Sequence, residues 1–479
     1  IKYIPVFVHG DAVFQWNGRW SLLLYLNEFK SNGTYPVFWP GLWALIYKAE
    51  SSFDNWIIPS LTQFILPVML IIISYIFFKK NKIIFLYNLF FIIVFFWTFK
   101  RTALVGYMDT PIAILYLIFF QLFLIYLFEK RDTSYLLLLS LIAGISAITK
   151  QVGFLLPFIS TLFMFIIYTD RKISFINFLI LSIIPFIFLI SFLSFDKIYN
   201  PFTFFYDLIF NSDGLETNFS HLQSEAQKSH LDSLNVIFES FNKFFLLFIL
   251  ITGLLNFINF KNKICIFGMI IFLFSLISFY FFSKYGSYDE RNGRFIITMI
   301  FSSSFFYIFS KFPSTDGFKL INFKDKSLRF NKIIFLLAII ILFLSIIFSK
   351  IINFREIQQE IQSMLGTIQY SDKTKKEIPM KINELILKSP KCSKVFIDEH
   401  ILAYNLKLIN YYNLDKNKSK IQVYNYPEEF LQNTSFESCD GPIIWYFKNE
   451  KSIEKLKINE LKNLKVTKLN KYLYLIYQK

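Results

Sequence analysis

The chain has 479 residues, of which 54% are hydrophobic and 20% aromatic, and its formal net charge is +16. Its apolar residues gather in long runs, which leaves too few polar side chains to cover a water-soluble fold, so lipid is the expected solvent. The positive charge separates these runs, as Lys and Arg do when they fix membrane topology, and this argues against nucleic acid as a partner.

Ten segments are long and apolar enough to be candidate membrane spans, since a span needs about 20 mostly apolar residues. They lie near residues 57–78, 83–99, 110–128, 134–149, 152–168, 173–195, 243–260, 264–283, 295–310 and 333–349. The chain begins with Ile rather than Met. One more span upstream would place the N-terminus in the cytoplasm and would make eleven spans. The predicted fold class is therefore mainly α, a polytopic transmembrane helix bundle.

The connections between the spans sort into two sets. Short, basic connections lie at residues 79–82, 129–132, 170–172, 261–263 and 311–332. The positive-inside rule assigns these to the cytoplasm. The other set, residues 1–56, 100–109, 150–151, 196–242, 284–294 and 350–479, is then extracytoplasmic. Functional residues are expected on this loop-rich side.

Three domains follow from this layout: a first extracytoplasmic loop (1–56), a transmembrane bundle (57–349) and a soluble extracytoplasmic domain (350–479). In the first, residues 11–30 suit a helix lying in the membrane interface, with Trp16 and Trp20 at headgroup depth. The last contains short β-rich runs between polar or helical stretches, which predicts a small α/β domain. The strand candidates are residues 394–398, 421–424, 443–447 and 472–477.

Two aspartates stand next to spans on the predicted extracytoplasmic side. Asp11 follows His9-Gly10, and Asp109 stands in Gly106-Tyr107-Met108-Asp109-Thr110-Pro111. Each suits the start of a helix, where Asp is a good cap. Each also suits a carboxylate that faces a cavity at the membrane surface, because ionisable groups at membrane depth often mark function.

Basic residues share this side of the membrane. Lys100 and Arg101 precede Asp109 in its loop, and with the two aspartates they would form a site for an anionic substrate. Lys150 occupies a very short turn, where it either reaches toward the headgroups or binds phosphate. Arg291 and Arg294 follow in a charged loop that is either solvated or binds phosphate in bidentate fashion.

Other kinds of chemistry have little support in the sequence. The four histidines lack metal-ligand spacing, and no Ser/His/Asp signature or nucleotide-binding fingerprint is present. Cys265 begins an apolar run. Cys392 and Cys439 lie in the polar tail, where they either form a disulfide or stay as two thiols.

Taken in order, the polar motifs resemble those of the GT-C superfamily of integral membrane glycosyltransferases. The resemblance covers residues 9–310 and is nearest to the branch of protein O-mannosyltransferases and aminoarabinose transferases, glycosyltransferase family 39. It is carried by Asp11, the stretch Tyr35-Pro36-Val37-Phe38-Trp39-Pro40, the loop around Asp109, the turn Thr149-Lys150-Gln151-Val152-Gly153, and Arg291-Asn292-Gly293-Arg294-Phe295.

The resemblance implies a sugar transfer from a polyprenyl-phosphate donor to a glycan, lipid or protein acceptor outside the cytoplasm, in the cell membrane of a bacterium. Asp11 would be the general base, Asp109 would orient donor or acceptor, and Lys150, Arg291 and Arg294 would hold the lipid phosphate. Some branches carry paired acids in the first loop, whereas Gly10 and Ala12 flank Asp11 here, so no cofactor or metal is expected.

Two other functions are compatible with parts of the sequence. A transporter or flippase of a lipid-linked saccharide would also need spans and an anion site, but such proteins often have paired halves, and no repeat is visible. A non-catalytic membrane scaffold would use Asp11 and Asp109 only as helix caps. Loss of activity without loss of folding, on mutation of the aspartates, would separate an enzyme from both.

Overall fold

The computed structural model describes residues 21–25, 38–51, 57–62, 65–80, 82–99, 108–128, 133–170, 173–194, 229–285 and 290–311, together with five strands between 394 and 478. The chain divides into two compact units. One comprises Phe29–Trp39 and Leu61–Ile357, and the other comprises Ile1–Glu28, Pro40–Ser60 and Gln358–Lys479. The first unit holds the helix bundle.

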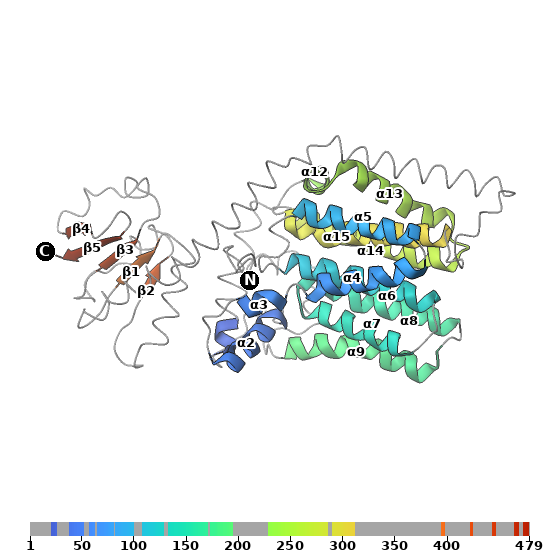
Figure 1. Ribbon diagram of the computed structural model, residues 1–479, viewed down its shortest axis with the longest axis horizontal. Helices are drawn as coiled ribbons and strands as arrows, with labels where there is room; N and C mark the ends of the chain where they lie inside the picture. Colours follow the sequence, from blue (N-terminus) through green and yellow to red (C-terminus); the bar gives the residue numbers. More distant parts are fainter. Residues whose placement is uncertain are drawn as a thin grey trace. The chain divides into compact units, whose positions relative to one another are not determined.

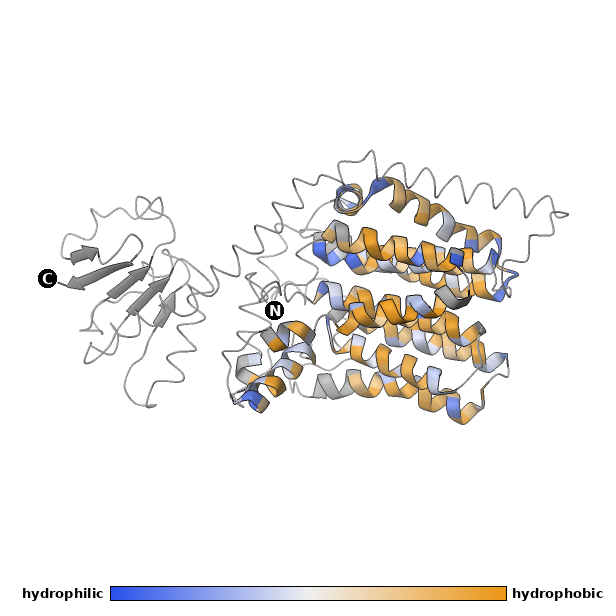
Figure 2. Ribbon diagram, in the orientation of Figure 1, coloured by the Kyte–Doolittle hydropathy of each residue, from blue (hydrophilic) through white to orange (hydrophobic). Residues whose placement is uncertain are grey.

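Nine of the ten predicted spans coincide with helices of this bundle, which lie side by side in Figure 1. They are α4 (Ile65–Lys80), α5 (Lys82–Phe99), α6 (Asp109–Phe128), α7 (Thr133–Ala147), α8 (Leu155–Thr169), α9 (Phe175–Ser194), α13 (Lys243–Ile258), α14 (Lys263–Tyr285) and α15 (Arg294–Lys311). The tenth, near 333–349, lies outside the described residues. Figure 2 shows that the helices are hydrophobic along their middles and hydrophilic at their ends.

By length and composition, four of the described helices can cross a membrane, and they contain α6, α8, α14 and α15. A fifth span is possible if α12 (His230–Ser240) and α13 count as one, although they are bent by 114°. Four shorter apolar helices correspond to α4, α5, α7 and α9. The protein is therefore a multi-pass membrane protein, and the total of ten spans stays a prediction.

Polar contacts mark the two opposite ends of the bundle. At one end, Lys150 bonds both Asp109 at the start of α6 and Asn292 just before α15. At the other, Lys263 at the start of α14 donates to Asp170 after α8 over 2.5 Å. The 23 residues of α14 separate the ends by about 35 Å. The loops at Asp109, Lys150 and Asn292 thus share one end, as predicted, and those at Asp170 and Lys263 share the other. Which end faces the cytoplasm, and the side of the remaining loops, stay predictions.

Hydroxyl groups fix α15 within the apolar bundle. The Ser304 hydroxyl is 2.5 Å from that of Tyr87 on α5 and 2.5 Å from that of Thr252 on α13. One residue nearer the start of α15, Ser303 donates to the carbonyl of Gly268 on α14 over 2.7 Å. Such interhelical hydrogen bonds add to close packing in a membrane, where the hydrophobic effect does not drive association. They fix α15, and with it the position of Arg294.

A second buried network joins α4, α5 and α6. Asn88 donates to Ser74 over 2.8 Å, and Gln121 donates back to Asn88 over 2.5 Å. Both amide side chains are fully buried. Since burial of an unpaired amide is unfavourable, these contacts specify the mutual register of the three helices.

Three short helices precede the bundle in the chain: α1 (Leu22–Tyr25), α2 (Phe38–Glu50) and α3 (Ile57–Leu61). Pro40 lies in the first turn of α2, where the missing N–H of proline is tolerated. The aromatic stretch around Trp39 is thus the start of a helix. Most of the predicted interfacial helix 11–30 lies outside the described residues.

The described strands near the C-terminus form one mixed sheet with the order β2-β1-β3-β5-β4. Their bounds are β1 (Lys394–Ile397), β2 (Gln422–Tyr424), β3 (Ile443–Tyr446), β4 (Leu464–Lys468) and β5 (Leu473–Gln478). β1 pairs in parallel with β2 and β3, whereas β5 pairs antiparallel with β3 and β4. Four strands match the predicted runs and β4 was missed. The helical part of the predicted α/β domain lies outside the described residues.

Candidate functional site

The first part of the site is the start of α6. Asp109 is the first residue of the helix, and Pro111 follows within its first turn. A carboxylate is favoured here by the helix dipole, and proline by its fixed φ. Asp109 is 7% and Thr110 1% exposed, so both polar side chains are held inside the bundle.

The second part is the turn between α7 and the 3₁₀ helix η4 (Gln151–Phe154), which presents Lys150 in an extended conformation. The Tyr116 hydroxyl donates to the carbonyl of Val152 over 2.7 Å, and the Phe38 amide donates to the carbonyl of Ile148 over 3.1 Å. A Cβ atom at Gly153 would overlap the carbonyl of Ser146, so only glycine allows this close approach. The turn is therefore rigid on both sides of Lys150.

The third part is the 3₁₀ helix η5 (Glu290–Gly293), which leads directly into α15. Asn292 belongs to η5, and Arg294 opens α15. Arg294 is fully buried, although arginine is almost never buried without partners.

These three segments join in what we call the polar cluster: Asp109, Thr110, Lys150, Asn292 and Arg294. The Lys150 ammonium forms an ion pair with the Asp109 carboxylate and donates to Asn292 Oδ1 over 2.9 Å. Arg294 donates to Thr110 Oγ1 over 2.8 Å. The side chains of Lys150 and Asp109 are only 13% and 10% exposed, so their charges are partly removed from water.

The guanidinium of Arg294 also lies over the ring of Phe99, 4.3 Å from the ring centre. This cation–π contact stabilises the charge where water is scarce. The positive charges of Lys150, Arg294 and Arg291 all act on the Asp109 carboxylate. The cluster is therefore rich in cations, and this composition suits an anionic ligand.

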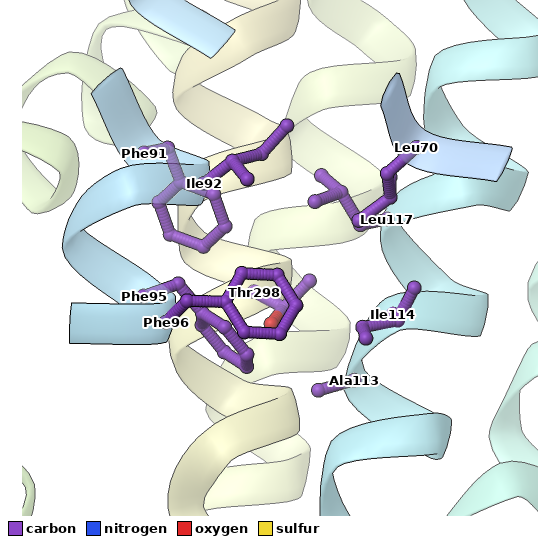
Figure 3. Close-up of a pocket in the computed structure, with 9 residues that line it drawn as sticks. All are labelled: Leu70, Phe91, Ile92, Phe95, Phe96, Ala113, Ile114, Leu117 and Thr298. Carbon is purple, nitrogen blue, oxygen red and sulfur yellow. The ribbon is translucent and has the colours of Figure 1, made fainter. Parts of the chain in front are cut away.

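An apolar pocket follows the polar cluster along the same two helices (Figure 3). It is lined by Leu70 of α4, Phe91, Ile92, Phe95 and Phe96 of α5, Ala113, Ile114 and Leu117 of α6, and Thr298 of α15. Thr298, the one polar residue of this lining, donates its hydroxyl proton to the carbonyl of Arg294. The wall therefore presents hydrocarbon to whatever enters.

The pocket and the polar cluster are one helical turn apart. Ala113 and Ile114 come four residues after Asp109 and Thr110, and Thr298 comes four residues after Arg294. A step of four residues is about 6 Å along a helix. Anion-attracting groups and an apolar recess are thus within reach of a single amphiphilic molecule.

The structure brings together Asp109, Lys150 and Arg294, three of the predicted site residues. The predicted Arg291 lies next to Asn292 in η5 and is partly exposed. Asp11, Lys100 and Arg101 lie outside the described residues. Sequence reasoning missed Thr110, Asn292 and Phe99 as site residues. The first two flank predicted charged residues, which is the signal that could have found them.

Among the described residues, no group of three or more His, Cys, Asp or Glu side chains is placed to hold a metal ion. Asp109, the carboxylate of the polar cluster, is engaged by Lys150. The absence of a cofactor stays a prediction.

The site thus belongs to a multi-pass membrane protein with a buried, cationic cluster at one end of its bundle. No protein-family profile matches the sequence, and no curated protein matches it. Among solved structures, the chain is similar to ArnT from Cupriavidus metallidurans, crystallised with undecaprenyl phosphate, at 11% identity and a TM-score of 0.48. The match covers 99% of this chain and 94% of that one.

Proposed function

We propose that the protein is a membrane glycosyltransferase of the GT-C type. It transfers a sugar from a polyprenyl-phosphate donor to an acceptor on the extracytoplasmic side of the membrane. One observation carries the proposal: the cationic polar cluster lies one helical turn from an apolar pocket on the same two helices. The proposed ligand has an anionic head, which would lie at the cluster, and a hydrocarbon chain, which would lie along the apolar wall.

The cations in the site have a direct role in such a reaction. When the bond between the sugar and the phosphate oxygen breaks, its electron pair goes to that oxygen, and negative charge develops on the phosphate. Preorganised cations stabilise this charge strongly in a site with little water. Lys150, Arg291 and Arg294 would do so, with Lys100 and Arg101 as further substrate-binding residues. Asp109 orients Lys150 through their ion pair.

The attacking group needs a base within hydrogen-bond reach of the acceptor. In the proposal, Asp11 removes the proton from an acceptor hydroxyl, whose oxygen attacks the anomeric carbon while the polyprenyl phosphate leaves. Direct displacement of this kind inverts the anomeric centre. The anomeric configuration of product and donor, compared by NMR, checks this step, and retention would disprove it.

The first experiment measures transfer from a panel of radiolabelled polyprenyl-phosphate sugars in membranes that contain wild type, Asp11→Asn or Lys150→Met at equal expression. Wild-type transfer that is lost in both variants supports the proposal and identifies the donor. Asp170→Asn is the matched control, because it removes a carboxylate from an ion pair at the opposite end of the bundle.

Other outcomes of this experiment lead elsewhere. Undiminished transfer by Asp11→Asn would remove Asp11 as the base. If wild type transfers no sugar from any donor, the enzyme proposal fails. Translocation of a lipid-linked sugar in vesicles would then test the transporter alternative.

A further inference from the structure

The indole N–H of Trp39 is buried without a hydrogen-bond acceptor among the residues that the structure describes. Trp39 is only 3% exposed, so bulk water does not supply the acceptor. An indole N–H can only donate, and burial of such a donor without an acceptor is unfavourable. Unpaired polar groups of this kind are rare in folded proteins and require a specific explanation.

Trp39 lies beside the turn that carries Lys150. The amide of Phe38, the preceding residue, donates to the carbonyl of Ile148 over 3.1 Å. Trp39 is thus one residue, and Lys150 two residues, from a bonded pair of backbone groups. Consecutive Cα atoms are about 3.8 Å apart, so both side chains start close to this contact and can reach a common ligand.

Described groups of this turn do not accept from the indole. The carbonyl of Ile148 already accepts from Phe38, and that of Lys150 accepts from Gly153 over 2.8 Å. The Lys150 ammonium is a donor itself. An anion drawn to Lys150 would bring several oxygen acceptors to the place where the indole lacks one.

We propose that the Trp39 indole N–H donates a hydrogen bond to a phosphate oxygen of the ligand that Lys150 holds. This deepens the proposed function, on which it depends, because it makes Trp39 a binding residue for the phosphate headgroup. It also gives a purpose to the aromatic stretch at the start of α2, which the charged residues alone leave unexplained.

Binding measurements in detergent or nanodiscs test this contact. The probes are undecaprenyl phosphate and uncharged undecaprenol, and the proteins are wild type, Trp39→Phe and Trp43→Phe. Trp43, one turn further along α2, is also fully buried and serves as the matched control. A hydrogen bond to a charged group corresponds to roughly a 10- to 100-fold change in affinity.

We expect Trp39→Phe to bind undecaprenyl phosphate about 10- to 100-fold more weakly and undecaprenol as tightly as before. Trp43→Phe should keep the wild-type ratio of the two affinities. A merely structural role for Trp39 would weaken both lipids equally, and this result would overturn the contact. If Trp39→Phe does not fold, 3-benzothienylalanine at position 39 replaces the N–H by sulfur with the shape retained, and the same expectation holds.

Two further results separate the possibilities. Wild type that binds undecaprenyl phosphate no better than undecaprenol would refute the headgroup site, and with it the proposed function. A wild-type preference that Trp39→Phe keeps in full would refute only the role of Trp39. Binding of inorganic phosphate identifies the source of the phosphate group. If Trp39→Phe weakens the binding of inorganic phosphate, the site takes free phosphate. If Trp39→Phe weakens only the binding of undecaprenyl phosphate, the contact is made to a lipid headgroup.

Discussion

Lys150 donates a hydrogen bond to Asn292 Oδ1 over 2.9 Å, which joins the turn after α7 to the 3₁₀ helix before α15. The same ammonium pairs with Asp109, so its direction is fixed by an acceptor on each of two segments. A lysine side chain is flexible when alone, and this arrangement orients it.

Replacement of Asn292 by Ala should therefore weaken donor binding and leave folding largely intact. Lys150 would keep Asp109 as its partner but lose one fixed direction, which should raise the KM for the donor about 10-fold, the equivalent of roughly 1.4 kcal/mol. Steady-state kinetics with the identified donor measures this. Asn259→Ala is the control, because Asn259 accepts a similar bond of 2.9 Å from Lys311 at the far end of the bundle. Equal effects of the two variants would contradict the prediction.

Asp109→Asn should destabilise the protein, since it leaves the ammonium of Lys150 buried without its counter-charge. Loss of one partner of a buried ion pair typically costs about 3–5 kcal/mol. The double variant Asp109→Asn with Lys150→Met should recover part of this loss in chemical unfolding of the purified protein. Asp170→Asn, whose partner Lys263 is 63% exposed, should cost only about 1 kcal/mol or less. The prediction fails if the double variant is less stable than Asp109→Asn.

Gly153→Ala should displace the turn that holds Lys150. The added methyl group would overlap the backbone carbonyl of Ser146, which cannot move aside as a flexible side chain could. We expect a loss of stability of about 1–3 kcal/mol together with a loss of transfer activity. Gly41→Ala is the control, because no atom lies within 4 Å of its added methyl group. Thermal unfolding and activity that stay at wild-type values in Gly153→Ala would show that the turn tolerates a side chain.

Ser304→Ala should lower the free energy of unfolding and leave the catalytic rate unchanged. It removes the hydroxyl shared by Tyr87 and Thr252, and hydrogen bonds between membrane helices contribute about 0.6 kcal/mol on average. Two such bonds predict a loss of about 1 kcal/mol in the free energy of unfolding, with kcat unchanged. Ser275→Ala should cost less, because the Ser275 hydroxyl bonds the carbonyl of Phe272 in its own helix. An equal loss in both variants would contradict the interhelical role.

The nine described helices that coincide with predicted spans were predictable from the sequence because each is a local feature. An apolar run of sufficient length must form its hydrogen bonds internally in lipid, and a helix does this. The charged members of the site were also visible, since Asp109, Lys150 and Arg294 stand at the ends of such runs. The strand β4 was missed because Leu464–Lys468 is short and lies in a lysine-rich stretch, with Leu464 and Val466 as its apolar residues.

The roles of the neutral partners in the site depend on which helices lie next to each other. Thr110 and Asn292 stand next to predicted charged residues, but their roles arise from contacts with Arg294 and Lys150 across 184 and 142 positions of sequence. The indole N–H of Trp39, which has no acceptor among the described residues, was likewise not visible in the sequence. Its sequence neighbours show an aromatic stretch, but only the burial and the contact with Ile148 reveal a donor beside Lys150.

The sequence distances within the polar cluster have a consequence for how the protein is made. Asp109 and Lys150 are 41 positions apart, whereas Lys150 and Asn292 are 142 apart. During synthesis the ion pair can therefore form as soon as α8 has entered the membrane, well before the ribosome reaches α15. This early ion pair neutralises the charges of Asp109 and Lys150 before the remaining helices of the bundle have been inserted. Arg294 then arrives last, and its insertion completes the site only when every helix that carries it is present.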